Sequence, residues 1–414
     1  MHYNPYVDYR TKYLTLKSHD GGSMNVFFEW ATNYSSEDYG DTFPEGHEPE
    51  YSLDGGRTWM KFVNKEGNYV YGGVELDKCI TVPAGGEILL KAEMNEYYTM
   101  TMYEYISLYW GDDSPNKGKF LIGADEDFDI SGNILSLVYG DNFKNYNNIT
   151  NINVDFWMAF RNTNVINAEN LYLDFTKSYD EQNPYDNQPL FEQMFMASSI
   201  EIAPKSIGGT TITPSCCYGM FQNCTSLTTT PDLPATTLAE SCYCKMFQNC
   251  TALTTAPALP ATALASSCYS SMFNGCTSLT TAPSVLPATT LASQCCNYMF
   301  QGCTSLTTAP ELPAETLASS CYYSMFKGCT SLTTAPELPA TTLVSTCYKF
   351  MFQDCTNLNY IKAMFTTTPS ISYTSNWVNG VSATGTFVKN SAAQWDVSGV
   401  NGVPDGWTVQ TASE

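Results

Sequence analysis

The amino-acid sequence predicts a multidomain protein in which an N-terminal all-β sandwich-like domain is followed by an α/β solenoid. Three observations lead to this fold class. The chain has 414 residues, which is more than one ordinary hydrophobic core accommodates. Short strand-like runs separated by turn signals occupy its first third. A pattern of Met-Phe pairs then recurs along the second half, as in a repeat protein.

The N-terminal domain is predicted from short runs of strand-forming residues. Pro49 to Phe62 (PEYSLDGGRTWMKF) is a hairpin candidate with Asp54-Gly55-Gly56 at its turn. Ile80 to Met94 predicts two further strands on either side of a Pro-Ala-Gly-Gly turn. Roughly a hundred residues of this kind are typical of an all-β sandwich.

A repeat of 26 residues, with one step of 27, dominates the second half of the chain. Its Met-Phe pairs are Met220-Phe221, Met246-Phe247, Met272-Phe273, Met299-Phe300, Met325-Phe326 and Met351-Phe352. In the second copy apolar residues occupy every fourth position from Leu238 to Cys250, which predicts one stripe on a helix of about three turns. The run Thr-Ser-Leu-Thr-Thr-Ala-Pro that follows predicts a short strand. Stacked units of this kind predict a leucine-rich-repeat-like solenoid with parallel strands, because one unit cannot bury its stripe alone.

The repeat divides the chain into four predicted parts. Residues 1–130 are the β-rich N-terminal domain, and residues 131–214 carry degenerate repeats and a cap. Residues 215–360 are the regular solenoid. Residues 361–414, with Trp395 and Trp407 among several glycines, are the C-terminal cap. Degenerate copies at the ends are expected because terminal units must cover the open core.

The chain is acidic although it carries few charges. Its formal net charge is −22 and its charged fraction is 14%. Most of the acidic residues precede residue 190. Such a field repels phosphate backbones and anionic lipid surfaces, so we expect no nucleic-acid partner. No stretch reaches the roughly 20 apolar residues of a membrane span, so membrane insertion is not expected either.

Fifteen of the sixteen cysteines lie in the repeat region, where two columns of six positions each are clear. The first is Cys216, Cys242, Cys268, Cys295 or Cys296, Cys321 and Cys347; the second is Cys224, Cys250, Cys276, Cys303, Cys329 and Cys355. We interpret both as buried thiols that pack as small hydrophobic groups. A structural zinc site is the alternative, but the sequence has no Cys-x-x-Cys pair and its three histidines all precede the repeats. Reduced thiols favour folding in a cytoplasm over export.

Two stretches of the N-terminal half are candidate sites. Strand alternation between Tyr97 and Trp110 points one row of tyrosines outward, and such a row stacks on sugars or anchors a docking partner: Tyr97, Tyr103, Tyr105 and Tyr109. A loop or a neighbouring subunit that covers the row is the alternative. Asp125, Asp127 and Asp129 alternate as in a calcium loop but lack its Gly and its bidentate Glu, so we favour a solvated acidic turn.

Catalytic motifs are absent from the sequence. It contains no nucleophile elbow, zinc-protease motif, P-loop or dinucleotide fingerprint. A cysteine nucleophile needs a histidine base, and no histidine follows His47. We therefore expect no enzyme activity, no cofactor and no metal.

Two repeat columns are candidate binding positions. The first is a Thr column, Thr228, Thr254, Thr280, Thr307 and Thr333, each followed by a second Thr. Strand alternation predicts that one of the two columns faces out, either as a hydroxyl surface for glycans or as a ladder that stabilises the strands. The second is a variable column, Gly219, Lys245, Ser271, Tyr298, Ser324 and Phe350. In that column we expect Lys245, Tyr298 and Phe350 to determine specificity.

The repeats resemble a known family. The units CYSSMFNGCTSLTTAPSVLPATTLA and CYYSMFKGCTSLTTAPELPATTLV resemble the BspA-like leucine-rich repeats of Bacteroidales surface proteins and of their bacteriophages. The flanking segments YSLDGGRTW, ISGNILSLVYGDNF and GTFVKNSAAQW are similar to parts of the same proteins. The resemblance implies a surface-exposed scaffold that binds proteins or glycans, and it carries no catalytic residues.

We expect a non-enzymatic protein with a structural and recognition function. The N-terminus lacks an export signal, which favours an exposed virion component such as a fibre or decoration, assembled in the host cytoplasm, over a bacterial cell-surface adhesin. Expected partners are other virion proteins and a host-surface protein or glycan, and a homo-oligomer is possible.

Overall fold

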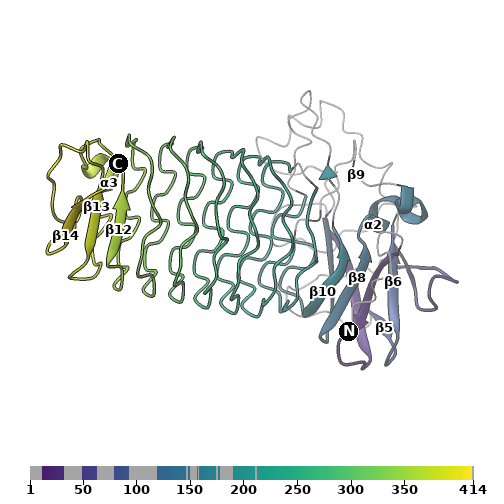
Figure 1. Ribbon diagram of the computed structural model, residues 1–414. Helices are drawn as coiled ribbons and strands as arrows, with labels where there is room; N and C mark the ends of the chain where they lie inside the picture. The colour runs from purple at the N-terminus through teal and green to yellow at the C-terminus, as the bar shows by residue number, and fades with distance from the viewer. Residues whose placement is uncertain are drawn as a thin grey trace. The chain divides into compact units, whose positions relative to one another are not determined.

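The computed structural model of the chain describes residues 12–31, 49–62, 79–92, 119–145, 148–149, 156, 158–173, 176–177, 190–209 and 212–412 (Figure 1). The chain divides into two compact units, Met1–Ile207 and Gly208–Glu414. We call them the N-terminal unit and the repeat unit. The predicted division into four parts stays a prediction.

Six strands of the N-terminal unit form one mixed sheet. Its order is β10 (Val165–Tyr172), β8 (Phe128–Asn133), β1 (Leu14–Ser18), β6 (Glu87–Lys91), β3 (Glu50–Ser52) and β4 (Met60–Lys61). Neighbouring strands are antiparallel except β10 and β8, which are parallel. Leu14 and Leu16 of β1 are fully buried whereas Thr15 and Lys17 are half-buried, so one face of this central strand packs on the core.

A second sheet and two short helices are also present in this unit. Strand β2 (Met24–Ala31) lies between β5 (Ile80–Val82) and β7 (Lys119–Ala124), antiparallel to both. Helix α2 (Ser136–Tyr139) leads directly into the 3-10 helix η3 (Gly140–Asn145). Two further short strands, β9 (Asn148–Ile149) and β11 (Thr176–Lys177), pair in parallel.

Lys91 of β6 is the centre of a charged cluster in the N-terminal unit. Its ammonium lies 2.9 Å from a carboxylate oxygen of Asp141 and 3.0 Å from one of Glu50. The same ammonium lies 4.4 Å from the centroid of the Trp59 ring. Burial alone would raise the pKa of Asp141, but hydrogen bonds from Tyr13 and Lys91 outweigh it and lower this pKa.

Each repeat is one rung of a stack, and each rung contains a ribbon of consecutive turns (Figure 1). We call this segment the turn ribbon; it spans residues 215–224, 241–250, 267–276, 294–303, 320–329 and 346–355. Every second N–H of a ribbon donates to a carbonyl of the next rung, as from Gly219 to Cys244 at 2.8 Å and from Phe221 to Met246 at 2.9 Å. The N–H groups between them donate three residues back within their own rung. The ribbon therefore satisfies its backbone without a helix or a strand.

Every fourth residue of the turn ribbon has a left-handed backbone. In the first ribbon Ser215, Gly219 and Asn223 have φ values of 52°, 58° and 64°. The three equivalent positions are left-handed in each of the five following ribbons. A single left-handed residue ends a right-handed helical turn, so the ribbon advances as separate turns and does not wind into a helix.

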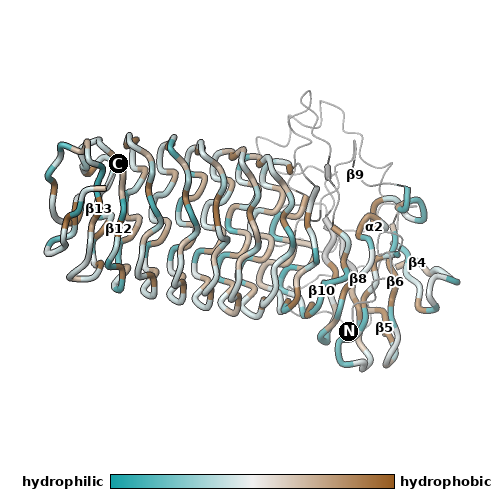
Figure 2. Tube along the Cα trace, viewed as in Figure 1, coloured by the Kyte–Doolittle hydropathy of each residue, from teal (hydrophilic) through white to brown (hydrophobic). Residues whose placement is uncertain are grey.

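Identical side chains stack through the interior of the repeat unit. The rings of the Met-Phe pairs lie 5.5 to 5.8 Å apart between centroids, from Phe221 to Phe352. Both residues of every pair are fully buried. Figure 2 shows that apolar and polar residues alternate along each rung. Burial of each ring contributes about 1.5–3 kcal/mol, and each stacked pair about 0.5–1.5 kcal/mol more.

The predicted fold class is wrong. The repeats form no α/β leucine-rich-repeat-like solenoid: the residues predicted as a helix in the second copy are consecutive turns, and the Thr-rich run has only isolated bridges. The described residues are mostly strand and turn, with α2 and α3 (Ile371–Thr374) as the two α-helices. The sandwich-like prediction needs correction too, because parallel pairing of β10 with β8 makes the larger sheet mixed and none of the sheets closes.

Regular strands return at the C-terminal end of the repeat unit. The strands β12 (Tyr360–Ala363), β13 (Thr386–Lys389) and β14 (Thr408–Thr411) form a parallel sheet. Trp377 takes the place of the Met of the earlier Met-Phe pairs, and its indole N–H donates to the carbonyl of Gly402 at 2.9 Å. The indole of Trp395, from the predicted cap, stacks on Phe365 at 5.3 Å between centroids.

The repeat cysteines are buried and none is in a disulfide. The interpretation as buried thiol columns is therefore confirmed. The second column does more than fill space, since the thiol of Cys250 donates to the carbonyl of Phe221 in the preceding rung at 3.1 Å. The thiols of the next four rungs make the equivalent bond at 3.0 to 3.1 Å. A ladder of S–H donors thus runs through the interior, and it requires protonated sulfur.

Candidate ligand-binding face of the repeats

The variable column predicted from the sequence coincides with the central left-handed position of the turn ribbon. Lys245, Tyr298 and Phe350 have φ values of 57°, 56° and 59°. Bulky side chains are rare at such φ values, and each instance costs on the order of 1–3 kcal/mol. The turn ribbon requires this backbone whatever the residue, and Gly219 occupies the same column, so the bulky side chains at these three positions are not needed for the turn and are the first place to look for function.

Tyr298 and Phe350 belong to an aromatic–lysine cluster, which we define as Tyr298, Tyr323, Lys327, Lys349 and Phe350. The ring of Tyr298 meets that of Tyr323 edge-on at 5.1 Å between centroids, and Tyr323 meets Phe350 edge-on at 5.5 Å. All five side chains are half-buried, and they come from three successive rungs. Burial and the neighbouring Tyr323 hydroxyl raise the pKa of Tyr298.

Lysines flank the rings of this cluster. The ammonium of Lys349 lies 5.1 Å from the centroid of Phe350 and 5.8 Å from that of Tyr323. The ammonium of Lys327 lies 5.7 Å from the same Phe350 ring. Cation–π contacts at exposed sites are worth about 0.5–1 kcal/mol each. The result is a row of rings with two positive charges at one end.

Lys245 lies apart from this cluster: it belongs to the second turn ribbon, whereas Phe350 belongs to the sixth. Its ammonium lies 5.2 Å from the centroid of the Tyr218 ring, and its hydrogen bond with Tyr218 raises the pKa of Lys245. The variable column therefore offers a ring and a lysine in two places, of which the Tyr298–Phe350 region holds more rings.

The Thr columns behave differently from the prediction. Both threonines of each pair are exposed in all five repeats, so the expectation that one column faces inward is wrong. The reason is that the segment forms isolated bridges, such as Thr255 with Thr281, and a pleated strand is needed for strict alternation. One hydroxyl supports the ladder alternative, since Thr280 Oγ1 donates to the carbonyl of Thr254 at 3.1 Å.

The predicted site residues occupy separate segments of the rung. The Thr column follows each turn ribbon and bridges from rung to rung by its own hydrogen bonds, whereas Lys245, Tyr298 and Phe350 lie within the ribbons. The tyrosine row Tyr97, Tyr103, Tyr105 and Tyr109 lies outside the described residues. The carboxylate of Asp125 accepts hydrogen bonds from the N–H and side-chain amide of Asn25, at 2.7 and 2.8 Å.

The sequence prediction missed Tyr323, Lys327 and Lys349. They belong to neighbouring columns, and column-by-column comparison at a spacing of 26 does not join them to Tyr298 or Phe350. The backbone register does: the N–H of Tyr298 donates to the carbonyl of Tyr323 at 2.8 Å, a spacing of one residue less than the repeat. A comparison of each residue with its neighbours at both spacings would have found the cluster.

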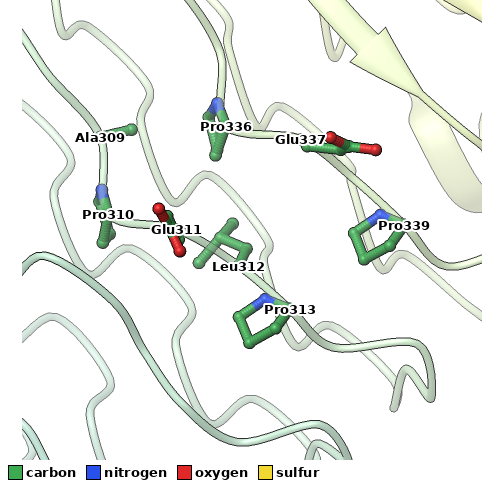
Figure 3. A pocket seen from close by; sticks show the side chains of 8 residues that line it. All are labelled: Ala309, Pro310, Glu311, Leu312, Pro313, Pro336, Glu337 and Pro339. Carbon is green, nitrogen blue, oxygen red and sulfur yellow. The ribbon is translucent and has the colours of Figure 1, made fainter.

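A shallow hollow of about 590 Å³ lies elsewhere on the rungs (Figure 3). It is lined by the Pro-Glu-Leu-Pro segments of two adjacent repeats, with Glu311 and Glu337 between proline rings. Glu337 is paired with Lys362 at 2.8 Å. The segment recurs with small changes in other repeats, so the hollow follows from the repeat itself and no separately built site is evident there.

Comparisons with known proteins found no match: no family model, no curated protein and no solved structure is similar to the chain. Within the described ranges, no group of three or more His, Cys, Asp or Glu side chains is placed to hold a metal ion. In that same part of the chain, no helix has both the length and the apolar character that crossing a bilayer requires.

Proposed function

We propose that the chain is a non-enzymatic recognition protein exposed on a bacteriophage particle, where it binds a host-surface protein or glycan. The observation that carries this proposal is the aromatic–lysine cluster on the turn ribbons. Rings and lysines of this kind anchor partners, and Tyr298 and Phe350 are held there at strained backbone positions. The interior columns repeat from rung to rung while the cluster does not, as expected of a fixed scaffold that presents a variable surface.

The thiol ladder supports the virion over the cell surface. Fifteen cysteines of the repeats are buried, and the five thiols from Cys250 to Cys355 donate hydrogen bonds to carbonyls. Such thiols must stay reduced while the chain folds, and a cytoplasm provides that condition. A particle component assembled inside the host meets it directly. The resemblance to BspA-like repeats of Bacteroidales and their bacteriophages is compatible with both locations.

The test is peptide mass spectrometry on gradient-purified phage particles beside the outer-membrane fraction of the host bacterium. We expect enrichment in intact particles, at a constant ratio to the capsid proteins across the gradient. Enrichment in the membrane fraction alone would make the chain a bacterial cell-surface adhesin. A fluorescently labelled full-length chain should in addition bind host cells, and the Tyr298→Ala variant should bind them more weakly.

A further inference from the structure

We propose that the aromatic–lysine cluster binds a carboxylate-bearing polysaccharide, in an extended form that runs across successive rungs. This inference rests on the proposed recognition function and names its ligand class. It is carried by three features of the cluster: a row of rings, two cations beside it that are in no ion pair, and a left-handed backbone at two of the three rings, Tyr298 and Phe350.

The rings of the cluster are arranged as a row that a sugar polymer can follow. Tyr298, Tyr323 and Phe350 come from three consecutive rungs, with centroids 5.1 and 5.5 Å apart. Rungs joined by backbone hydrogen bonds repeat about every 4.7–4.9 Å. A linear polysaccharide can therefore place one sugar against each rung, with the C–H face of the sugar on the aromatic side chain.

The charges beside the row call for an anion. The repeat unit contains no arginine and five lysines: Lys245, Lys327, Lys349, Lys362 and Lys389. Lys362 is paired with Glu337, and Lys389 donates to the carbonyl of Trp395 at 3.0 Å. Among the described residues, Lys327 and Lys349 are in no ion pair, yet both ammonium groups lie within 5.7 Å of the Phe350 centroid. Two like charges at one ring repel each other, and a bound carboxylate would remove that cost.

The rest of the chain argues against other polyanions. A formal net charge of −22 opposes the approach of nucleic acid or an anionic membrane, whose charge density is high. A polysaccharide with one carboxylate on some of its sugars needs only local cations and the ring row. The cluster provides both within three rungs. A protein partner would use the rings equally well, but it does not explain why the two unpaired lysines converge on Phe350.

The strained position of Phe350 adds a second argument. Its φ of 59° belongs to a column that accepts Gly219 at the start of the repeats, so a ring is not needed for the fold there. Phe350 is half-buried and contacts Tyr323 and both lysines, so its ring holds the row and the charges together. Because Gly fits this column without strain, the Phe350 side chain is present at a backbone cost, and its contacts with Tyr323 and the two lysines are what it adds.

The test measures binding of the full-length chain to three carboxylated polysaccharides, polygalacturonate, alginate and hyaluronate, by biolayer interferometry. Fully methyl-esterified polygalacturonate is the matched neutral probe, because it keeps the sugar chain and removes the charge. EDTA is present so that calcium cannot bridge the acidic protein to the polymer. We expect binding to at least one charged polymer that weakens at least tenfold on esterification, and that also weakens as salt rises.

Three variants locate the site. Lys327→Gln combined with Lys349→Gln should weaken binding at least tenfold, and Phe350→Gly should do the same while it relieves the left-handed strain. Lys362→Gln, which removes a paired lysine outside the cluster, is the control and should bind as the unchanged chain does. Thermal unfolding of each variant checks that the fold is retained.

Several outcomes would overturn the inference. These are no binding to any of the three polymers, equal binding to the esterified probe, or variants of the cluster that bind as well as the control. Host-cell binding that survives periodate oxidation but not protease treatment would make the partner a protein and would also overturn it. All of these leave the proposed function intact if the chain is found on purified particles; absence from particles would remove that function independently.

Discussion

The two units of the chain satisfy their backbones in different ways. The N-terminal unit uses a six-stranded ladder and a charged cluster in which Lys91 binds Asp141 and Glu50. The repeat unit uses turn ribbons whose N–H groups alternate between their own rung and the next one. Its interior contains phenylalanine rings and thiols in place of ion pairs. The first unit therefore depends on ionised groups and the second on groups that must stay neutral.

The units also differ in how far a contact reaches. In the sheet, β8 contacts both β1 and β10, and these come from parts of the chain more than a hundred residues apart. In the repeat unit every described ladder joins a rung to its immediate neighbours. A destabilising substitution in one rung should therefore affect mainly the adjacent rungs. A destabilising substitution in β1 should affect the whole sheet.

The largest expected effect is a cavity in the phenylalanine stack. Phe273 lies 5.5 Å from the ring on either side and is fully buried, so Phe273→Ala should lower the free energy of unfolding of the repeat unit by about 3–5 kcal/mol. Urea unfolding measures the loss. Hydrogen–deuterium exchange should rise most in the turn ribbons at 241–250, 267–276 and 294–303.

Two substitutions calibrate this prediction. Thr281→Ala removes an exposed side chain of the same rung and should change the free energy of unfolding by less than about 0.5 kcal/mol. Leu16→Ala removes a fully buried side chain of β1 and should raise exchange across the N-terminal sheet. An equal rise in β1 and β8 caused by Phe273→Ala would contradict the short reach of the rungs.

The next effect is the sensitivity of the repeat unit to alkali. Burial raises the pKa of Cys276 and Cys355 to about 12 and that of Cys347 to about 11. Unfolded thiols titrate near about 8.5. The pKa of each thiol is higher in the folded state than in the unfolded state. The stabilisation from the neutral thiols is therefore complete below the unfolded pKa, and it is lost as pH rises from there through the folded pKa. Each such thiol should lower the free energy of unfolding by about 1.4 kcal/mol per pH unit between the two values.

The measurement is urea unfolding in reductant from pH 7.5 to 10.5. Cys276→Ala should reduce the slope of the free energy of unfolding against pH by the contribution of one thiol. Thr280→Ala should leave this slope unchanged. Cys295 is the exception within its column, because its hydrogen bond with Cys296 lowers the pKa of Cys295. A free energy of unfolding that does not change between pH 8.5 and 10.5 would mean that the thiols are solvated or oxidised.

A smaller effect of opposite sign is expected for the N-terminal unit. The lowered pKa of Asp141 means that its contribution is present above the unfolded value, near about 3.9, and is lost as pH falls below it. Its side chain is 60% exposed, so Asp141→Asn should cost less than about 1 kcal/mol at neutral pH. Hydrogen exchange of β6 and η3 between pH 3 and 6 measures the loss. Asp232→Asn in the repeat unit should leave this acid profile unchanged.

Sequence reasoning succeeded where the repeat alone decides the structure. A spacing of 26, with one step of 27, was enough to place the Met-Phe pairs and both cysteine columns in the interior, whatever the local backbone. It was enough to single out the column of Lys245, Tyr298 and Phe350 as variable. It did not join that column to Tyr323 and the two lysines, because the rungs pair with an offset of one residue.

The prediction of a helix in each repeat was wrong because a spacing of four residues was taken for the helical period. Buried residues at every fourth position were assigned to a helix, whose true period is 3.6. In the turn ribbon the spacing is four, with pairs such as Cys216-Cys217 and Met220-Phe221 buried and the residues between them partly exposed or glycine. A helix of this length would have drifted away from a strict spacing of four. Pairs of apolar residues at that spacing, with Gly or Asn two residues after the pair as at Gly219 and Asn223, are the pattern that indicates left-handed turns.

Two substitutions at left-handed positions test that explanation directly, by the sign of their effects. Gly328 and Ser324 are consecutive left-handed positions of one ribbon, with φ values of 75° and 53°. A Cβ at Gly328 would lie 3.8 Å from its nearest neighbours, so Gly328→Ala has the space it needs and should lose only about 1–2 kcal/mol of backbone preference. Ser324→Gly should be neutral or stabilising, because relief of about the same strain outweighs the chain entropy of roughly 0.5–1 kcal/mol that glycine adds. Urea unfolding of the two variants compares them. A helix through these residues predicts the reverse order, with Ala favoured and Gly penalised, so the sign of the difference alone decides between the two backbones.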